Sequence, residues 1–535
     1  MIDFSTFTSK KSLFIGLLLV IIFCQSNGQN ISDRLELENV IVKFDSRAYL
    51  FSTNLNSLES GFEFPKGSGN STIFASSYWL TGIDSSTNAL HSSFKTYPNS
   101  FDCFFAGPAR NPPYNDQSRN GIFKISKSTV IDFNQNFGMP GYVIPSSIIN
   151  WPGNGNVNSG MSKKLAPFFD LNNNGNYESI QNGDFPLALG TENLYFLNND
   201  ISGNRTGLNP SVPGLNIEIR TYAYVLEDEY DAFKDCVFLN VVLKNRSQIK
   251  YKDVYFGLWF DFDIGGGSDD YIGCDSALNV FYAYNADNSD NDYGNFIPAQ
   301  GLMLLNNNFN SFIGYNNSIN SINGNPQNPI EANNYLHGLW KNGNKISQTG
   351  NGTDTFNTTY TKFLFNNGVN QESGPGYDKR ALGGIGPFSL SQNESECFDL
   401  VVFPALDTIS PIAYSSVVQL LNKADTIKKL FDMVGQGCAS SLISGIEYLE
   451  ENREINQVSI YPNPSRDWVY INCENTFSNW SLKLFESIDG KEIFHASGSG
   501  AISRAINLNS YREGLYILQI QTNLFSNNFK ILIHD

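Results

Sequence analysis

The stretch with the most specific chemistry runs from Asp170 to Asp184. Oxygen-bearing side chains alternate along its first half, and Gly175 follows at the sixth position. A calcium loop needs this arrangement, because the cation takes six to eight oxygen ligands and glycine permits the sharp turn between them. The predicted ligands are Asp170, Asn172, Asn174, Asn176 (through its carbonyl oxygen), Glu178 and Asp184.

This loop departs from an EF-hand at its twelfth position. Gln181 stands where an EF-hand places a bidentate glutamate, so helices need not flank the loop, and Asp184 would close the site instead. Few of the predicted ligands are charged, which indicates a modest affinity. The alternative is an Asn-rich turn that binds no ion.

A second acidic stretch surrounds the three consecutive glycines at 265–267. Its carboxylates are Asp261, Asp263, Asp269, Asp270 and Asp275. Asp261 and Asp263 are predicted to share a strand face, about 7 Å apart. A cation site at Asp261, Asp263, Asp269 and Asp270 is favoured, because the cluster is otherwise self-repelling. The alternatives are a solvated turn, or a glycosidase-like carboxylate pair with Tyr255 and Trp259 as sugar platforms.

Other chemistry has little support in the sequence. It contains no G-x-S-x-G, H-E-x-x-H or phosphate-loop motif, and its four histidines are isolated from one another. The net charge of −17 disfavours nucleic acid as a partner, since phosphate binding needs a basic surface. We therefore assign no catalytic residue.

Short strands joined by polar turns are expected to carry these loops. Aromatic residues make up 14% of the chain, and Asn/Gly/Ser clusters interrupt its apolar runs. Residues 218–226 and 236–243 predict a strand pair, and residues 253–264 alternate as a third strand. One face of that third strand is apolar and the other half polar and partly exposed, which predicts an antiparallel β-sandwich of one or two subdomains.

The ends of the chain differ from this β-rich body, which spans residues 29–434. Residues 1–28 combine Lys10, Lys11, an apolar run and small residues, as in a secretory signal peptide. Residues 411–431 predict one amphipathic helix, and 435–456 a linker. No segment after the signal has 18 consecutive apolar residues, so no transmembrane segment is expected.

Six cysteines remain after the signal peptide, and none forms a CxxC pair. Their spacing disfavours a metal cluster. Some would pair in an oxidising compartment, or several would be buried apolar side chains, and the sequence leaves both open.

The last segment, 457–535, contains several short motifs. They are Tyr461-Pro462-Asn463-Pro464, Gly490 in a turn, Gly514-Leu515-Tyr516, and Phe529-Lys530-Ile531-Leu532. This segment resembles the type A C-terminal sorting domain of the type IX secretion system of Bacteroidetes. The resemblance implies a small Ig-like β-sandwich, recognition by the type IX machinery, and a secreted or cell-surface location reached through the periplasm.

The passenger also resembles an uncharacterised group of Bacteroidetes surface proteins with the same tail. The similar segments are 166–170, 238–240, 255–263, 269–275, 334–340 and 378–380. The resemblance implies one long passenger with the acidic loops built in, and no activity.

These observations lead to three hypotheses for the passenger. The first is a calcium-stabilised binding or adhesive module without catalysis, whose ligand would be an extracellular glycan or surface polymer. The second is a carbohydrate-active hydrolase that uses Asp261 or Asp263. The third is a purely structural surface protein.

Overall fold

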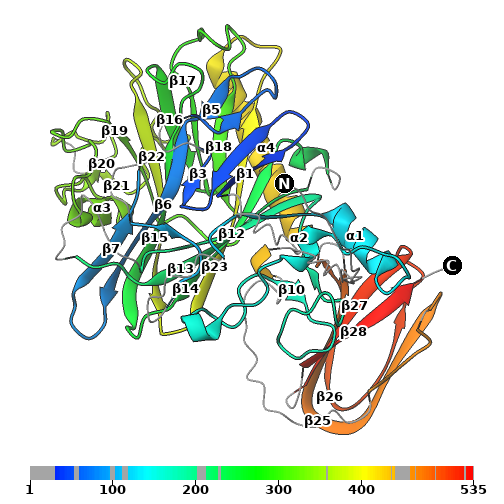
Figure 1. Cartoon of the computed structure of the whole chain (residues 1–535). Helices are drawn as coiled ribbons and strands as arrows, with labels where there is room; N and C mark the ends of the chain where they lie inside the picture. Colours follow the sequence, from blue (N-terminus) through cyan, green and yellow to red (C-terminus); the bar gives the residue numbers. More distant parts are fainter. Residues whose placement is uncertain are drawn as a thin grey trace, which may run out of the picture.

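The computed structural model describes residues 31–533 apart from 53–58, 97–102, 111–118, 202–211, 227–229, 357–358, 435–436, 440–457, 464, 488–489 and 523–525. The predicted signal peptide and most of the predicted linker lie outside these residues. Two large antiparallel sheets pack face to face, and a separate C-terminal sheet lies to one side (Figure 1).

The first large sheet has the strand order β19-β22-β15-β6-β3-β2-β4-β5, with β1 beside β2 and β7 beside β6. Its strands are β1 Ser32–Glu36, β2 Ile41–Asp45, β3 Tyr49–Leu50, β4 Phe62–Glu63, β5 Ser71–Ile73, β6 Ala75–Asp84, β7 Leu90–Phe94, β15 Tyr251–Asp261, β19 Ser311–Asn316 and β22 Lys379–Leu390.

The second large sheet has the order β16-β17-β18-β23-β14-β13-β12-β8, with β9 beside β12. Its strands are β8 Phe105–Ala106, β9 Phe123–Ser126, β12 Glu192–Asn199, β13 Ile217–Val225, β14 Val237–Asn245, β16 Asp270–Asp275, β17 Val280–Asn285, β18 Ala299–Leu304 and β23 Ser395–Ala405. Two small hairpins pair β10 Phe168–Phe169 with β11 Phe185–Pro186 and β20 Ile346–Ser347 with β21 Tyr360–Thr361.

One apolar core fills the space between the two large sheets. Phe256 on β15 stacks on Phe398 of β23, with ring centroids 5.2 Å apart, so the two sheets share one interior. The predicted mostly β sandwich is confirmed. The predicted strand pair is also present, because β13 pairs with β14 from Ile217↔Asn245 to Val225↔Val237.

Helices cover the outer faces of the sandwich. They are α1 Lys127–Asn136, α2 Ser146–Ile149, α3 Pro329–Leu336 and α4 Ala413–Val434, with short 3-10 turns at Val157–Ser159, Asp231–Phe233 and Gly437–Ala439. Helix α4 lies where a helix was predicted, and its Phe431 stacks on Phe238 with centroids 5.6 Å apart. Helices α1 and α3 were not predicted from the sequence. Each contains two Asn residues and begins at a polar cap, Ser126 for α1 and Asn328 for α3.

The prediction that one face of β15 is partly exposed is wrong. Trp259 is 0% exposed and Tyr255 is 5% exposed. Helix α3 lies over this face, and the His337 ring at its end has its centroid 4.0 Å from that of Tyr255. Both faces of β15 are therefore interior.

The cysteines combine the two alternatives that the sequence left open. Cys397 and Cys438 form a disulfide with Cα atoms 5.8 Å apart, which ties β23 to the turn after α4. The other described cysteines, Cys103, Cys236, Cys274 and Cys473, are buried.

The C-terminal sheet has the order β24-β25-β27-β28, with β26 beside β25. Its strands are β24 Ser459–Tyr461, β25 Trp468–Glu486, β26 Glu492–Asn507, β27 Gly514–Thr522 and β28 Ser526–Ile533. The pairing of β25 with β26 is irregular between Cys473 and Trp480, where the strands curl (Figure 1). The curl places Ile471 and Leu482, from the two halves of β25, in one core, as in a small sandwich.

Candidate cation sites

The predicted calcium loop is the connection between β10 and β11. Phe169 pairs with Phe185 in this hairpin, and their ring centroids are 4.9 Å apart. Asp170 and Asp184 come directly after and directly before this pair, so the hairpin brings the first and last predicted ligands together. Both are buried, with exposed fractions of 6% and 0%.

Main-chain amides of the loop donate to both carboxylates. Asp170 accepts from the amides of Asn174 (3.2 Å) and Gly175 (2.7 Å). Asp184 accepts from the amides of Leu171 (2.9 Å) and Glu178 (2.8 Å). These bonds fold the chain around the two carboxylates.

The remaining predicted ligands lie along the same turn. The Asn172 and Asn174 side-chain oxygens accept from the amides of Asn174 (3.2 Å) and Asn176 (2.8 Å). The Asn174 amide group donates to a Glu178 carboxylate oxygen at 2.6 Å. Gly175 has φ +75°, which explains glycine at the sixth position. The structure therefore brings all six predicted ligands into one loop.

Burial dominates the electrostatics of the two aspartates in the loop. Burial raises the pKa of Asp170, and burial together with the charges of Asp170 and Glu178 raises the pKa of Asp184. Desolvation is the largest cause of both shifts, and the amide hydrogen bonds offset it only in part. The donors are all oxygens, which suits a hard cation such as calcium.

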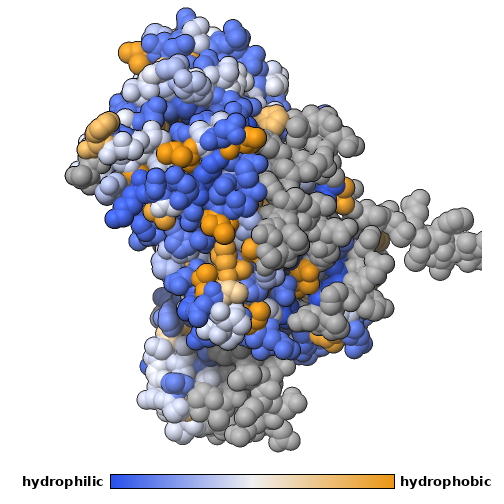
Figure 2. Space-filling model, turned by 90° about the vertical axis from the view of Figure 1, so that its left-hand side faces the viewer, coloured by the Kyte–Doolittle hydropathy of each residue, from blue (hydrophilic) through white to orange (hydrophobic). Residues whose placement is uncertain are grey.

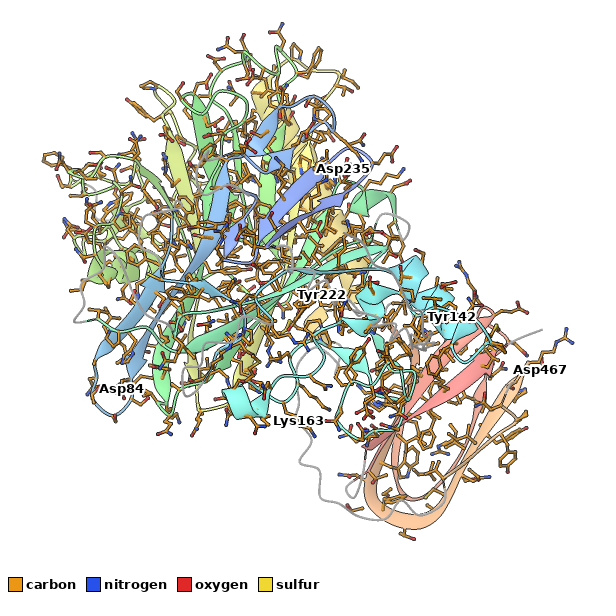
Figure 3. All side chains as sticks on the ribbon, in the orientation of Figure 1. Asp84, Tyr142, Lys163, Tyr222, Asp235 and Asp467 are labelled. Atoms are coloured by element: carbon orange, nitrogen blue, oxygen red, sulfur yellow. A yellow bond between two sulfur atoms is a disulfide. The ribbon has the colours of Figure 1, made fainter. Side chains whose placement is uncertain are left out.

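The C-terminal sheet packs against this loop. Asn528 on β28 donates to the Asp170 carbonyl oxygen at 3.5 Å, and the Lys530 ammonium lies 5.9 Å from the Phe137 ring centroid. Phe485 and Ile517 enter the same apolar cluster as Leu187. Figure 3 shows Tyr142, beside α1, on the side of the passenger that faces these strands.

The second acidic stretch is divided between two places. Oxygens of Asp261, Asp263 and Asp378 lie within 4.8 Å of one another. Arg380 is among them, with its Nε 3.4 Å from Asp261 and a closer contact to Asp378. Burial and the Asp378 charge raise the pKa of Asp263 to about 7. This group can hold a cation only in competition with the Arg380 guanidinium.

Asp269 and Asp270 lie at the start of β16, next to Asp290 rather than Asp261. Asp270 accepts from the Ile264 amide at 3.1 Å, and Asp290 accepts from the Gly266 amide at 3.0 Å. The structure therefore separates Asp261, which lies with Asp263 and Asp378, from Asp269 and Asp270, which lie near Asp290. Asp290 and Asp378 were not predicted as members of a cation site, because both lie outside the acidic stretch from Asp261 to Asp275.

The remaining residues singled out around this stretch form hydrogen bonds within the fold or are buried in its interior. Asp275 accepts from the amides of Ala277 and Leu278, both at 3.0 Å, and so closes the turn to β17. The Trp259 indole donates to the Tyr315 hydroxyl at 2.6 Å in the interior. Trp259 and Tyr255 are therefore not exposed sugar platforms.

The tail residues singled out in the sequence meet in the C-terminal sheet. The Asn463 amide group donates to the Lys530 carbonyl oxygen at 2.6 Å, and its oxygen accepts from the Leu532 amide at 2.9 Å. Tyr461 stacks on Tyr470 with centroids 5.9 Å apart, and the Tyr516 hydroxyl donates to the Arg512 carbonyl oxygen.

Four further tail positions were singled out in the sequence, and the structure describes three of them. Gly490 lies in the β25–β26 turn with φ +69° and begins a hairpin, as predicted. Pro462 follows β24, and Gly514 is the first residue of β27. Pro464 lies outside the described residues.

Residues 459–534 match a family model described as "Secretion system C-terminal sorting domain". No curated protein matches the chain. Among the described residues, no helix has the length and apolar character needed to cross a membrane.

The chain is also similar to solved structures, at low identity. They include a polysaccharide lyase (10% identity over 59% of this chain and 34% of that chain, TM-score 0.19) and a copper-containing benzylamine oxidase from Hansenula polymorpha (8%, 75% and 63%, TM-score 0.27). The lysyl oxidase of Pichia pastoris is 10% identical over 69% of this chain and 52% of that chain, with a TM-score of 0.27. The chain spans less than two thirds of the length of each, and these TM-scores support no functional argument.

Proposed function

Because the chain is a type IX secretion cargo that is secreted or displayed at the cell surface, we propose that its passenger is a calcium-stabilised binding module without catalysis. The loop from Asp170 to Asp184 is the observation that carries the proposal. Its ends are fixed by the β10–β11 hairpin, and its side chains offer a set of oxygen ligands. Calcium there would replace the amide hydrogen bonds of the two aspartates in part and neutralise their charge.

The expected gain in stability follows from mass action. A cation that binds only the folded state stabilises it by about 2.7 kcal/mol when its concentration is 100 times its Kd. The β10–β11 hairpin that carries the loop shares one apolar cluster with the second large sheet and with the C-terminal sheet. The increase in the free energy of unfolding should therefore apply to the whole passenger.

A binding role is supported over hydrolysis by the surroundings of the acidic residues. Asp261 is 2% exposed and faces Arg380, whereas a glycosidase pair must reach both sides of a sugar ring. Figure 2 shows one face of the passenger as mostly hydrophilic, with hydrophobic residues in small separate groups. Such a face suits a polar polymer, such as an extracellular glycan, better than an apolar partner.

The calcium part of the proposal is tested by the melting temperature of the full-length secreted protein. Calcium should raise it and a chelator should lower it, and Asp170→Asn with Asp184→Asn should remove a large share of this difference. Asp467→Asn is the matched control, because Asp467 is exposed on the C-terminal domain (Figure 3). A melting temperature that is indifferent to calcium in the wild type would refute calcium stabilisation.

The binding part is tested on a panel of polysaccharides in the presence of calcium. Retention of the protein with intact glycan is the expected outcome. New oligosaccharides, detected by mass spectrometry, would replace the binding module with a hydrolase. The absence of retention on every polymer would favour a purely structural surface protein.

A further inference from the structure

The three consecutive glycines after β15 are the starting point for a second site. A Cβ on Gly265 would lie 2.2 Å from a carboxylate oxygen of Asp290, and one on Gly267 would lie 2.2 Å from a carboxylate oxygen of Asp263. Gly265 also has φ +68°. Glycine is needed at both positions because the main chain passes directly against two carboxylates.

The middle glycine leaves space for a methyl group beside two other carboxylate oxygens. A Cβ on Gly266 would lie 3.5 Å from Asp269 Oδ1 and 3.5 Å from Asp290 Oδ2. The two oxygens are therefore at most about 7 Å apart, and ligands on opposite sides of a calcium ion are about 5 Å apart. Small side-chain rotations would bring both within reach of one cation.

Asp270 is the third carboxylate of this region, and the charges of Asp263, Asp269 and Asp290 act on it. It is 1% exposed, and its Oδ2 accepts from the Ile264 amide. Asp270 Oδ1 and Asp269 Oδ1 are buried and accept no hydrogen bond from the described residues. A buried carboxylate oxygen without a donor is costly, and a cation would supply the missing partner.

The nearby basic side chains are engaged with other acids. Lys379 contacts the Asp270 main-chain oxygen at 3.4 Å, but it forms an ion pair with Glu372. Arg380 pairs with Asp378 and Asp261. Burial, together with the charges of the neighbouring aspartates, raises the pKa of Asp270 well above its usual value.

We propose that Asp269, Asp270 and Asp290, with Asp263 across the glycine turn, bind a second calcium ion, independent of the loop at Asp170. The ligands come from the end of β15, the start of β16 and the connection after β17. The ion would hold together three segments of the passenger that are separated in the sequence. The donors are carboxylates, which favour calcium over a transition metal.

The test measures calcium stoichiometry on the full-length protein by calorimetry with calcium chloride alone. Two ions are expected for the wild type. Asp269→Asn with Asp290→Asn should bind one fewer, and Asp292→Asn should bind both, because Asp292 is exposed two residues from Asp290. Asp170→Asn with Asp184→Asn should lose the other ion, so the two proposals fail separately.

Gly266→Ala provides a variant that keeps every carboxylate. Its methyl group would make ordinary contacts at 3.5 Å and occupy the room for the ion. Loss of one calcium from this variant, with an unchanged melting temperature in chelator, is the expected result. Two bound ions in both Gly266→Ala and the double aspartate variant would overturn the second site. Displacement of this ion by an equal concentration of magnesium would overturn its assignment to calcium.

Discussion

The two acidic regions of the passenger both contain buried carboxylates, but they differ in how those carboxylates are hydrogen-bonded. In the loop from Asp170 to Asp184, backbone amides of one short hairpin connection donate to both buried carboxylates. Around Gly266, carboxylates arrive from three separate segments, and two of their buried oxygens accept no hydrogen bond from the described residues. Backbone amides also donate to Asp270 and Asp290 in the second region, but they leave those two buried oxygens without a donor among the described residues.

This difference predicts different consequences of ion binding. In the Asp170 loop a cation competes with hydrogen bonds that already exist, so its net contribution is reduced. At the glycine turn it relieves an existing penalty for buried charge. We therefore expect the glycine turn to be the more calcium-dependent of the two regions.

Gly265→Ala should produce the largest loss of stability. The new Cβ would meet the Asp290 carboxylate at 2.2 Å and stand at φ +68°. Overpacking and left-handed strain together should cost about 2 to 4 kcal/mol. The measurement is the urea unfolding midpoint in chelator. Gly266→Ala is the control, and its midpoint should be close to that of the wild type. Equal losses in the two variants would show that the turn is loose and does not cradle the carboxylates.

Gly175→Ala probes the other region in the same way. Gly175 has φ +75°, so alanine should cost about 1 to 2 kcal/mol from left-handed strain. Gly175→Asn should cost less, because asparagine tolerates this conformation, as Asn173 does nearby at φ +56°. The same urea midpoints measure both variants. A greater loss for asparagine than for alanine would contradict the argument from backbone conformation.

Local patterns allowed the first region to be predicted from the sequence. Alternating oxygen-bearing residues with a glycine at the sixth position identified the Asp170 loop, and helical spacing identified α4. The tail motifs indicated the sorting domain through their resemblance to that family. In the structure, the hydrogen bond from the Asn463 amide group to the Lys530 carbonyl oxygen lies within the small C-terminal sheet. Each of these signals is contained in a short stretch of chain.

The second region could not be predicted in this way. Asp290 reaches Gly265 from the connection after β17, and Asp378 reaches Asp261 through the pairing of β22 with β15. Period-two alternation of β15 also gave no sign that α3 would cover its outer face. Such contacts depend on sheet order, which no single segment of the sequence specifies.

Asp399 is a third buried carboxylate and serves as a contrast to both regions. Asn240 donates to it at 2.8 Å, as does the Cys438 amide, and burial raises its pKa to about 7. The nearby Tyr224 has a raised pKa as well. Hydrogen bonds from fixed neighbours partly compensate this carboxylate, so calcium should not affect it.

The pH dependence of stability follows from this raised pKa. The folded state holds the Asp399 proton between pH about 4 and 7 while the unfolded state has lost it, so stability should fall as pH rises through this window by up to about 1.4 kcal/mol per pH unit. Above pH about 7 the contribution should level off. Asp399→Asn should flatten this part of the profile, measured by unfolding from pH 5 to 8 in chelator. An identical slope in wild type and variant would contradict the assignment.

Lys530→Gln should have the smallest effect of these variants. It should change the calcium affinity of the Asp170 loop and leave that of the glycine turn unchanged. Burial lowers the pKa of Lys530 while the charge of Asp184 opposes that shift, which places its ammonium in the field of the Asp170 loop. Removing this charge should tighten calcium at the loop by about two- to fivefold, since a partly screened charge contributes at most about 1 kcal/mol. Calorimetry on the full-length protein should show this gain at low salt and less of it at high salt, because salt screens the interaction. The ion proposed at the glycine turn should keep its affinity and so provides the internal control, because Asp184 is the charge that acts on Lys530. Lys429→Gln on α4 is the matched surface variant. A weaker loop site in Lys530→Gln would mean that docking of the C-terminal sheet, through Asn528 and its neighbours, organises the loop for the ion instead of competing with it.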